Sequence, residues 1–572
     1  MGEELSAQQP AKSWDDVVAE LTGEGQLFEM RTRDVRGVPL RTWVHAPESL
    51  RTLVEISKLH GEVPMSVYEG ESLTYTEHFA RTAALAHRLI DEYGIGKGDR
   101  VAIAMRNFPE WTIAFFAATC AGAVAVPLNA WWSADELEFG LRDSGSRVLI
   151  ADGERAERLR DKLPGLDVAV IVARPDGELP PGAREFASVI GAYDGDDGAA
   201  LPDVALEPDD NATIFYTSGT TGRPKGALGT HRNICGNILC LAYGMLAGAL
   251  RDGHTVEEAL GSGRRVTLLT VPLFHATGCH AVLATTVFTG GTLVLMYKWD
   301  PERALELIAK EKVSTFSGVP TMAWQMLSSP RFAAYDTSSL TGVSYGGAPA
   351  PPKLVDRIRE LLPNRTPSNG YGLTETSSVS TYNSGVDYVQ RPESVGRPVA
   401  VVDVKVVGAD GADLPEGEVG ELWIKGPNIV AGYWNRPDAT AAAFTDGWFH
   451  SGDLARVDAE GFVYIVDRAK DMLIRGGENV YCAEVEAALY EHPAVADAAV
   501  IGVPDDVLGE EVGAVLVLNP GTELTLETLR AYLKDRIAPF KIPSHLWIRQ
   551  SELPRNAGGK ILKTRLRSEI LP

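Results

Sequence analysis

The feature that most constrains the fold is an alternation of short valine- and isoleucine-rich runs with amphipathic segments of helical period. It continues from Leu73 to Leu362. Strands separated by helical segments in this way pair through crossovers, and the pattern is typical of parallel sheets covered by helices. The sequence therefore predicts an α/β fold over this range.

The pattern changes after Ser394, where short β-like runs are separated by glycine, aspartate and proline turns, which predicts a smaller β-rich subdomain. Residues 467–471 place four charged side chains around one alanine, the composition of an exposed connector. Beyond it, strand-like and helix-like patterns predict a small α+β domain. We expect a large N-terminal part of several subdomains, residues 1–468, and a small mobile C-terminal domain, residues 469–572.

Composition and charge exclude several classes of protein. The 572 residues are 45% apolar and 23% charged, which is average for globular proteins and long enough for two or more domains. The net charge of −23 repels phosphates, so we expect no nucleic acid as a partner. The cysteines are too scattered for a disulfide framework or a zinc site. They are Cys120, Cys235, Cys240, Cys279 and Cys482.

The N-terminus is acidic and has no apolar core, which argues against a signal peptide and predicts a cytoplasmic protein. Two uncharged stretches, 111–132 and 266–297, contain glycine and proline breaks. Each is better explained as an interior strand–helix crossover than as a membrane span. We therefore expect no transmembrane segment.

The most informative motif is the segment 217–226, which follows the strand-like run ATIFY. Its glycines let backbone N–H groups turn toward an anion, its hydroxyls donate further hydrogen bonds, and Lys225 adds a cation. It is not a Walker loop, because Pro224 precedes the lysine and Gly226 follows it. A phosphate ligand is therefore expected on Thr217, Ser218, Gly219, Thr220, Thr221, Gly222 and Lys225.

Five further motifs follow in order, at 345–349, 369–376, 447–453, 467–470 and 554–560. With this set, nearly the whole chain resembles the acyl-adenylate-forming superfamily of acyl-CoA synthetases, luciferases and adenylation domains. It looks most like a bacterial medium- or long-chain fatty acid:CoA ligase. The resemblance implies that a carboxylic acid and ATP form an acyl-adenylate and pyrophosphate, and that CoA then displaces AMP.

The resemblance also implies roles for single residues. Adenine would stack on Tyr371, Thr374 would contact phosphate, and Glu375 would hold Mg²⁺, a hard cation that prefers oxygen ligands. Asp453 would accept hydrogen bonds from the ribose hydroxyls, with Arg468 beside it. The remaining ATP-binding positions are Gly346, Gly347, Ala348, Asn369, Gly370 and Gly372.

Lys560 is the catalytic lysine by the same resemblance. Together with Lys225 and Mg²⁺ it would stabilise the negative charge that builds on the phosphate oxygens. In the second step, rotation about the hinge position Lys470 would withdraw Lys560 and bring the glycine segment with Gly476 and Gly477 to the CoA tunnel.

The segment 272–278 resembles the stretch that lines the acyl pocket in this superfamily. His275 stands where amino-acid-activating relatives have an aspartate, so an amino acid substrate is not expected. Gly278, Val319, Trp324 and Met326 suggest an apolar tunnel. A medium- or long-chain fatty acid is the first expectation and an aryl or ring-containing acid the second.

Several alternatives stay open. The chain ends without a carrier domain, which predicts free CoA as the acceptor, although transfer to a separate carrier protein or oxidation of the adenylate is compatible with the motifs. Residues 342–346 match a serine-hydrolase elbow, with Ser344, Asp453 and His492 in the right order. The prolines at 349–352 obstruct the helix such an elbow requires, so Ser344 is expected to end a strand. A non-catalytic nucleotide-binding protein and a homodimer are also compatible.

Overall fold

The computed structural model describes residues 9–191, 199–217, 224–261, 263–347, 350, 352–363, 365–468, 471–476, 478–505, 507–534, 536–556 and 559–571. Within this part of the chain, the strands form a β1–β2 hairpin and four larger sheets, which we name sheets A to D. The hairpin strands are β1 (Met30–Val35) and β2 (Val38–Trp43).

Sheet A is seven-stranded among the described residues, with a parallel centre closed on one side by the antiparallel β10–β11 pair. Helix α5 (Pro109–Cys120) packs against this sheet, and α4 (Tyr75–Asp91) packs on α5. Its strand order is β11 (Lys225–Thr230), β10 (Asn211–Thr217), β6 (Val124–Pro127), β5 (Arg100–Ala104), β7 (Val148–Asp152), β8 (Ala169–Ala173) and β9 (Arg184–Glu185).

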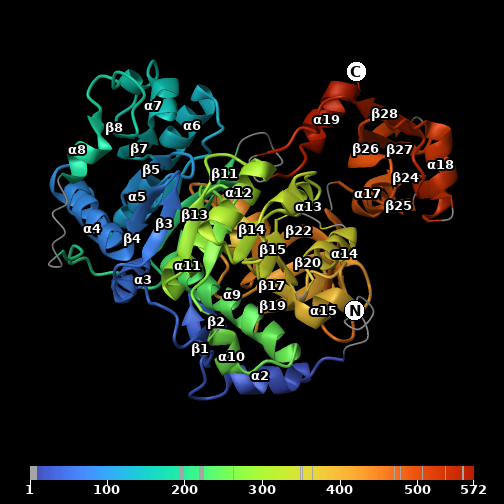
Figure 1. Cartoon of the computed structure of the whole chain (residues 1–572), viewed down its shortest axis with the longest axis horizontal. Helices are drawn as coiled ribbons and strands as arrows, with labels where there is room; N and C mark the ends of the chain where they lie inside the picture. Colours follow the sequence, from blue (N-terminus) through green and yellow to red (C-terminus); the bar gives the residue numbers. More distant parts are fainter. Residues whose placement is uncertain are drawn as a thin grey trace.

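Sheet B is nine-stranded among the described residues and parallel except at its two edges. It lies at the centre of the molecule, where its green and yellow strands stand between sheet A and the C-terminal lobe (Figure 1). Its order is β18 (Arg397–Pro398), β17 (Thr381–Ser384), β16 (Thr366–Tyr371), β15 (Gly342–Gly346), β14 (Thr315–Gly318), β12 (Val266–Leu269), β13 (Thr292–Leu295), β3 (Pro64–Tyr68) and β4 (Glu71–Thr74).

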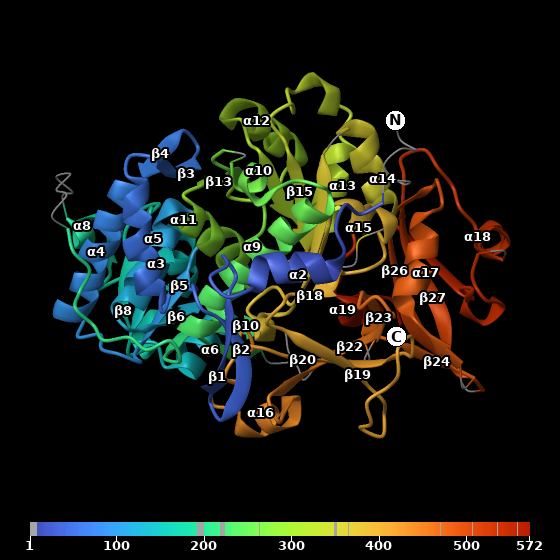
Figure 2. The same ribbon diagram turned by 90° about the horizontal axis from the view of Figure 1, so that it is seen from below.

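Sheet C is the β-rich part predicted after Ser394, and it is antiparallel. Its strands are β19 (Asp403–Val407), β20 (Gly420–Lys425), β21 (Phe444–Thr445), β22 (Trp448–Val457) and β23 (Val463–Arg468). Sheet D belongs to the C-terminal lobe, and Figure 1 and Figure 2 both show this lobe at one end of the molecule. Its strands are β24 (Leu473–Arg475), β25 (Glu478–Val480), β26 (Val495–Asp505), β27 (Gly509–Leu518) and β28 (His545–Arg549).

The remaining helices cover these sheets. They are α2 (Trp14–Thr22), α3 (Leu50–Ser57), α6 (Ala134–Ser144), α7 (Gly153–Leu159), α8 (Phe186–Ile190), α9 (His231–Arg251), α10 (Val256–Leu260), α11 (Thr285–Thr289), α12 (Pro301–Glu311), α13 (Pro320–Leu327), α14 (Pro352–Leu361), α15 (Gly385–Gln390), α16 (Pro437–Ala443), α17 (Cys482–Tyr490), α18 (Leu526–Leu533) and α19 (Lys563–Ile570). The α/β fold class, with a β-rich subdomain and an α+β C-terminal part, is thereby confirmed.

Both uncharged stretches form strand–helix crossovers, as predicted: 111–132 contains α5 and β6, and 266–297 runs from β12 through α11 to β13. Residues Trp111 to Cys120 of α5 are buried on every side, which explains why this helix carries no polar stripe.

Among the described residues, α9 is long and apolar enough to cross a bilayer, but 83% of its most apolar window is buried inside the fold. It is a core helix that packs against β17.

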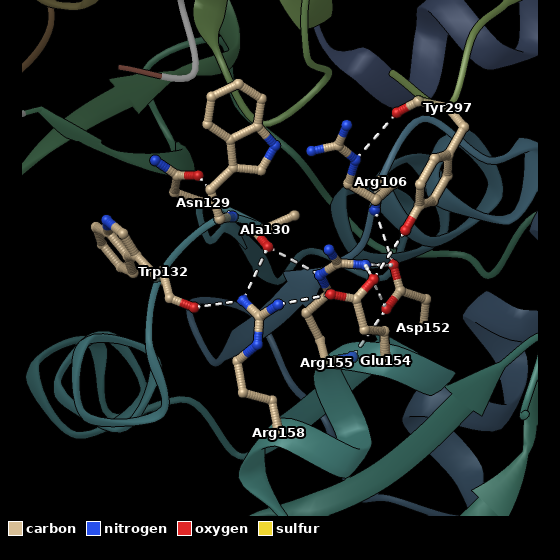
Figure 3. A network of polar contacts seen from close by, with 10 residues as sticks. Arg106, Asn129, Ala130, Trp132, Asp152, Glu154, Arg155, Arg158 and Tyr297 are labelled. Carbon is tan, nitrogen blue, oxygen red and sulfur yellow. Dashed lines mark hydrogen bonds and ion pairs between the residues drawn. The ribbon is translucent and has the colours of Figure 1, made fainter. Parts of the chain in front are cut away.

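A buried polar network ties sheet A to sheet B (Figure 3). Asp152, at the end of β7, caps α7 and pairs with Arg155 at 3.0 Å, and both side chains are almost fully buried. Arg106 donates through Nε to the carbonyl of Tyr297 at 3.0 Å, while the Tyr297 hydroxyl donates to Glu154 at 2.8 Å. The network fixes the carboxyl edge of sheet A relative to the segment after β13.

Candidate active site

A cavity of about 1000 Å³ opens where the carboxyl ends of the sheet B strands meet sheet C and the C-terminal lobe. Motifs that lie far apart in the sequence meet at its walls. Of the predicted site residues, those that line it are Thr217, Lys225, His275, Val319, Gly346, Gly347, Gly370, Gly372, Thr374, Glu375, Arg468 and Lys560.

A hydrogen-bonded trio lies beside the cavity. The Tyr371 hydroxyl donates to Asp453 Oδ2 at 2.7 Å, and Arg468 Nε lies 3.0 Å from Asp453 Oδ1. Asp453 and Arg468 are direct partners on β22 and β23, so sheet C fixes the pair. Burial raises the pKa of the Tyr371 hydroxyl well above its ordinary value. The trio holds a carboxylate beside the cavity, where it can accept hydrogen bonds from sugar hydroxyls.

Glycines on the cavity wall are needed where two backbone segments approach closely. A Cβ on Gly346 would lie 2.5 Å from the Gly370 carbonyl oxygen, and one on Gly372 would lie 1.4 Å from that of Ser378. Neither position accepts a side chain without moving the backbone. Tyr371, Asn369 and Asp453 are not among the described residues that line the cavity.

Glu375 is the buried carboxylate of the site. It lies in a short turn, Thr374–Thr376, where its Oε1 accepts a hydrogen bond from the Tyr433 hydroxyl at 2.7 Å. Burial raises the pKa of this carboxyl, and the Tyr433 hydrogen bond opposes that shift. Lys225 Nζ lies 5.2 Å from the centre of the Tyr433 ring. Tyr433 was missed by sequence reasoning because it belongs to none of the motifs.

These residues fit a magnesium ion that arrives with a nucleotide. The donor set is one carboxylate, Glu375, and the neighbouring Thr374 hydroxyl. The described residues contain no cluster of three or more metal-ligating side chains. Mg²⁺ commonly binds through one or two carboxylates and takes its other ligands from phosphate and water. The site therefore suits a phosphate-bound ion better than a metal held by protein alone.

The C-terminal lobe contributes Lys560 from a tight loop. Asn556 N donates to the Lys560 carbonyl at 2.8 Å, and Lys560 N donates back to Asn556 Oδ1 at 2.9 Å. Arg555 donates to the Gly559 carbonyl at 2.7 Å and pairs with Asp497 at 2.7 Å. A Cβ on Gly559 would approach Val319 to 2.9 Å, so the backbone at Gly559 lies close to this side chain.

The predicted acyl-pocket residues divide into two groups. His275 and Val319 line the cavity, and His275 Nε2 is buried without a hydrogen-bond partner among the described residues. Gly278 instead allows close packing inside a π-helix, Thr277–Ala284, because its Cβ would lie 2.3 Å from the Pro272 carbonyl oxygen. Trp324 and Met326 were expected to line an apolar tunnel, and this expectation is wrong. Both pack with the core under sheet B and are absent from the described lining.

Some predicted positions lie outside the described residues: Ser218, Gly219, Thr220, Thr221, Gly222, Ala348, Lys470 and Gly477. Gly476 is described, and its N–H donates to the Leu508 carbonyl at 2.8 Å. It adopts a positive φ of 60° in the β24–β25 hairpin of sheet D.

Models of two known protein families match this chain. The AMP-binding enzyme family matches residues 55–434, and the AMP-binding enzyme C-terminal domain matches residues 484–560. The chain belongs to the AMP-binding enzyme family.

Its relatives share most of its length. A feruloyl-CoA synthase of Amycolatopsis is 39% identical over 87% of this chain and 94% of that protein. A long-chain-fatty-acid–CoA ligase of Mycobacterium tuberculosis is 37% identical over 86% of this chain and 92% of its own length. The solved o-succinylbenzoate CoA synthetase of Bacillus subtilis, in complex with ATP and magnesium, matches with a TM-score of 0.75 and 32% identity. That match covers 90% of this chain and 98% of the solved one.

This AMP-binding enzyme is thus a member of the AMP-forming acyl-CoA ligase family, and the serine-hydrolase alternative is not supported. Ser344 was expected to end a strand, but it lies in the middle of β15. Helix α14 begins only at Pro352, so no helix starts directly after the serine. Asp453 is engaged by Tyr371 and Arg468. His492 follows α17 and accepts the Ala494 N–H at 3.1 Å.

Proposed function

We propose that this AMP-binding enzyme joins a carboxylic acid to CoA in two steps within the cavity. A carboxylate oxygen of the acid attacks the α-phosphorus of ATP, and the bond to pyrophosphate breaks. The CoA sulfur then attacks the acyl carbon of the adenylate, AMP leaves with its oxygen, and the thiol proton passes to solvent. The observation that carries this proposal is that Lys560, Lys225 and Glu375, from three distant segments, line one cavity.

The chain's own residues then act by position and charge. Lys560 and Lys225 are cations on the cavity wall that can stabilise charge on phosphate oxygens as pyrophosphate departs. The Tyr371, Asp453 and Arg468 trio would orient the ribose, and the close Gly346 and Gly370 backbones would leave room for adenine. Mg²⁺, held by Glu375 and phosphate oxygens, would supply further neutralisation. No general base is needed, because the acid is already ionised.

The second step requires that Lys560 leave the acyl carbon. We propose that the C-terminal domain, residues 469–572, rotates about Lys470 relative to residues 1–468. Gly476 and Gly477 would then reach the CoA channel. Free CoA is the proposed acceptor, and a carrier protein is the alternative that the assay below distinguishes. The cytoplasm, where ATP and CoA are found, is the proposed location.

The acid is proposed to be ring-containing rather than a plain fatty acid. Leu241, Met245 and Val282 supply an apolar wall, but many other lining residues are serine or threonine. A saturated chain would bury these hydroxyls without replacing their hydrogen bonds to water, which costs free energy. The relatives include both a feruloyl-CoA synthase and long-chain fatty acid ligases, so they do not favour either kind of acid. The proposal of a ring-containing acid therefore rests on the residues that line the cavity.

The test is acid-dependent exchange of pyrophosphate into ATP, followed by thioester formation with free CoA. The expected products are acyl-CoA, AMP and pyrophosphate. Formation of ADP, or the absence of exchange across aryl and aliphatic acids, would overturn the proposal. Exchange without thioester formation from CoA would point to a carrier protein as the acceptor.

A further inference from the structure

Tyr433 contacts two opposite charges on the cavity wall. Its hydroxyl donates to Glu375 Oε1 at 2.7 Å, and the Lys225 ammonium nitrogen lies over its ring, 5.2 Å from the ring centre. All three residues line the cavity. Among the described residues, no ion pair joins Lys225 to Glu375. Each charged group therefore meets one part of the same tyrosine instead of meeting the other charge.

This separation needs a physical cause, because opposite charges attract strongly where water is scarce. Glu375 is buried, so a lysine that reached it would form a strong pair. A phenol side chain offers the two groups separate contacts, since the ring face attracts a cation and the hydroxyl donates to a carboxylate. The lysine is then not consumed by the carboxylate, and the carboxylate is not consumed by the lysine.

The backbone holds Tyr433 in place on both sides. The Trp434 N–H donates to the carbonyl of Gly226, the residue after Lys225, at 2.8 Å. The Tyr433 N–H itself donates to Thr440 Oγ1 of α16 at 2.9 Å. The tyrosine is thus tied to β11, where Lys225 is the first residue, and to the helix that follows. Its ring cannot move away from the lysine without breaking these bonds.

The same segment of chain also holds the backbone of Glu375. The Val430 N–H donates to the Glu375 carbonyl at 2.9 Å. The buried Asn428 side-chain amide donates to the Thr376 carbonyl at 3.1 Å, which fixes the turn that carries Glu375. One segment, 428–434, therefore fixes the backbone around both charged groups.

We propose that Tyr433 is a positioning residue that keeps Lys225 and Glu375 apart until the nucleotide binds. Its ring acts as a spacer that prevents the two side chains from pairing, and its hydroxyl aims the Glu375 carboxylate. The inference rests on the proposed ligase function and adds to it a residue that belongs to none of the sequence motifs. Two variants separate the parts of the side chain: Tyr433→Phe removes the hydroxyl and keeps the ring, whereas Tyr433→Leu removes both.

The first test measures the binding of ATP in EDTA, without magnesium, by calorimetry. In Tyr433→Leu the lysine can pair with Glu375, so we expect the affinity for ATP to fall about tenfold, because a charge-assisted bond to phosphate is lost. Adding Glu375→Gln to this variant frees Lys225 and should raise the affinity about tenfold again. The same substitution in the wild type should change the affinity much less, and the comparison of all four proteins isolates the coupling.

The second test measures acid-dependent pyrophosphate exchange. Tyr433→Phe should bind ATP in EDTA as the wild type does, yet its kcat should fall about tenfold, since the Glu375 carboxylate has lost a hydrogen bond. Tyr464 is the matched control outside the cavity lining, because the Arg456 guanidinium carbon lies 3.9 Å from its ring centre and its hydroxyl donates to Asp458 at 3.1 Å. Tyr464→Leu and Tyr464→Phe should keep wild-type binding and exchange.

Thermal melting shows whether each variant is folded, and Tyr433→Met provides a second variant without the ring. Wild-type affinity for ATP in the variants without the ring, or no recovery when Glu375→Gln is added, would overturn the role of Tyr433 as a spacer. An unchanged kcat in Tyr433→Phe would overturn the role of the hydroxyl. The absence of exchange in the wild type would instead refute the proposed function, while ATP binding in EDTA would still test the spacer.

Discussion

The Tyr371 hydroxyl donates to Asp453 Oδ2 at 2.7 Å, and this contact joins β16 of sheet B to β22 of sheet C beside the cavity. Asp453 also pairs with Arg468, and its side chain is only 4% exposed. One buried carboxylate is therefore oriented by two elements that belong to different sheets. Its geometry depends on how those sheets are packed.

Removal of this carboxylate should weaken the use of ATP. In Asp453→Ala, Arg468 and the Tyr371 hydroxyl lose their common partner, and the proposed ribose contact is lost. We expect kcat/KM for ATP to fall about 10- to 100-fold, because one or two hydrogen bonds to a charged group are lost. Exchange kinetics at varied ATP measure it, with Asp446→Asn in the exposed turn before β22 as the control. An unchanged kcat/KM for ATP would contradict the role of Asp453.

Substitution of Lys560 should abolish most adenylation. Lys560→Ala is expected to lower acid-dependent pyrophosphate exchange by roughly 10²–10³-fold, because a charge-stabilising donor is removed from the reacting phosphate. Lys534→Ala, at an exposed position after α18, is the matched control. Hydrolysis or CoA transfer from a supplied acyl-adenylate should be affected much less. Undiminished exchange in the Lys560 variant would contradict the assignment.

Stability should depend on pH through Asp467, which lies three residues before the proposed hinge. This carboxyl accepts hydrogen bonds from Cys482 N, at the start of α17, and from Arg468 N, and it faces Lys563 and Glu486. Burial raises the pKa of Asp467 from 3.8 to about 6. Because this pKa is raised on folding, its stabilising contribution is present below pH 3.8 and is lost as the pH rises through about 6.

Thermal unfolding of the wild type and of Asp467→Asn at pH 4, 5, 6 and 7 measures this effect. The stability of the variant relative to the wild type should rise across that range, on the order of 1–3 kcal/mol. Asp410→Asn, at an exposed turn, serves as the control. A relative stability that stays flat or falls with pH would show that Asp467 does not titrate as proposed.

The network of Figure 3 should be essential for stability. Asp152→Ala leaves the buried Arg155 guanidinium without its main partner and removes the cap of α7. We expect the free energy of unfolding to fall by about 3–5 kcal/mol. Denaturant unfolding measures it. Asp135→Ala, which removes an exposed pair with Lys162, should have no measurable effect. A loss in the Asp152 variant no larger than in this control would argue against the network as a tie between the sheets.

Much of the fold could be predicted from local pattern. Alternating apolar runs predict the parallel strands of sheets A and B, because burial of both faces selects such runs. The phosphate-loop residues Thr217 and Lys225, and the motif residues Glu375 and Lys560, were named from the sequence and line one cavity. Trp324 was misplaced, because an apolar side chain on a helix does not reveal which face meets the cavity.

The sequence by itself determined the motifs. These motifs supply the residue types that the site needs: a phosphate-binding loop, a carboxylate and a lysine. Only the tertiary structure decided which side chains share a space. Tyr433 reaches Glu375 across 58 positions of the chain, and four serines of sheet B lie side by side only because their strands pair in one register: Ser317, Ser344, Ser368 and Ser384. Register and sheet packing depend on contacts among many distant residues, and a shift of one residue would turn each serine into the core.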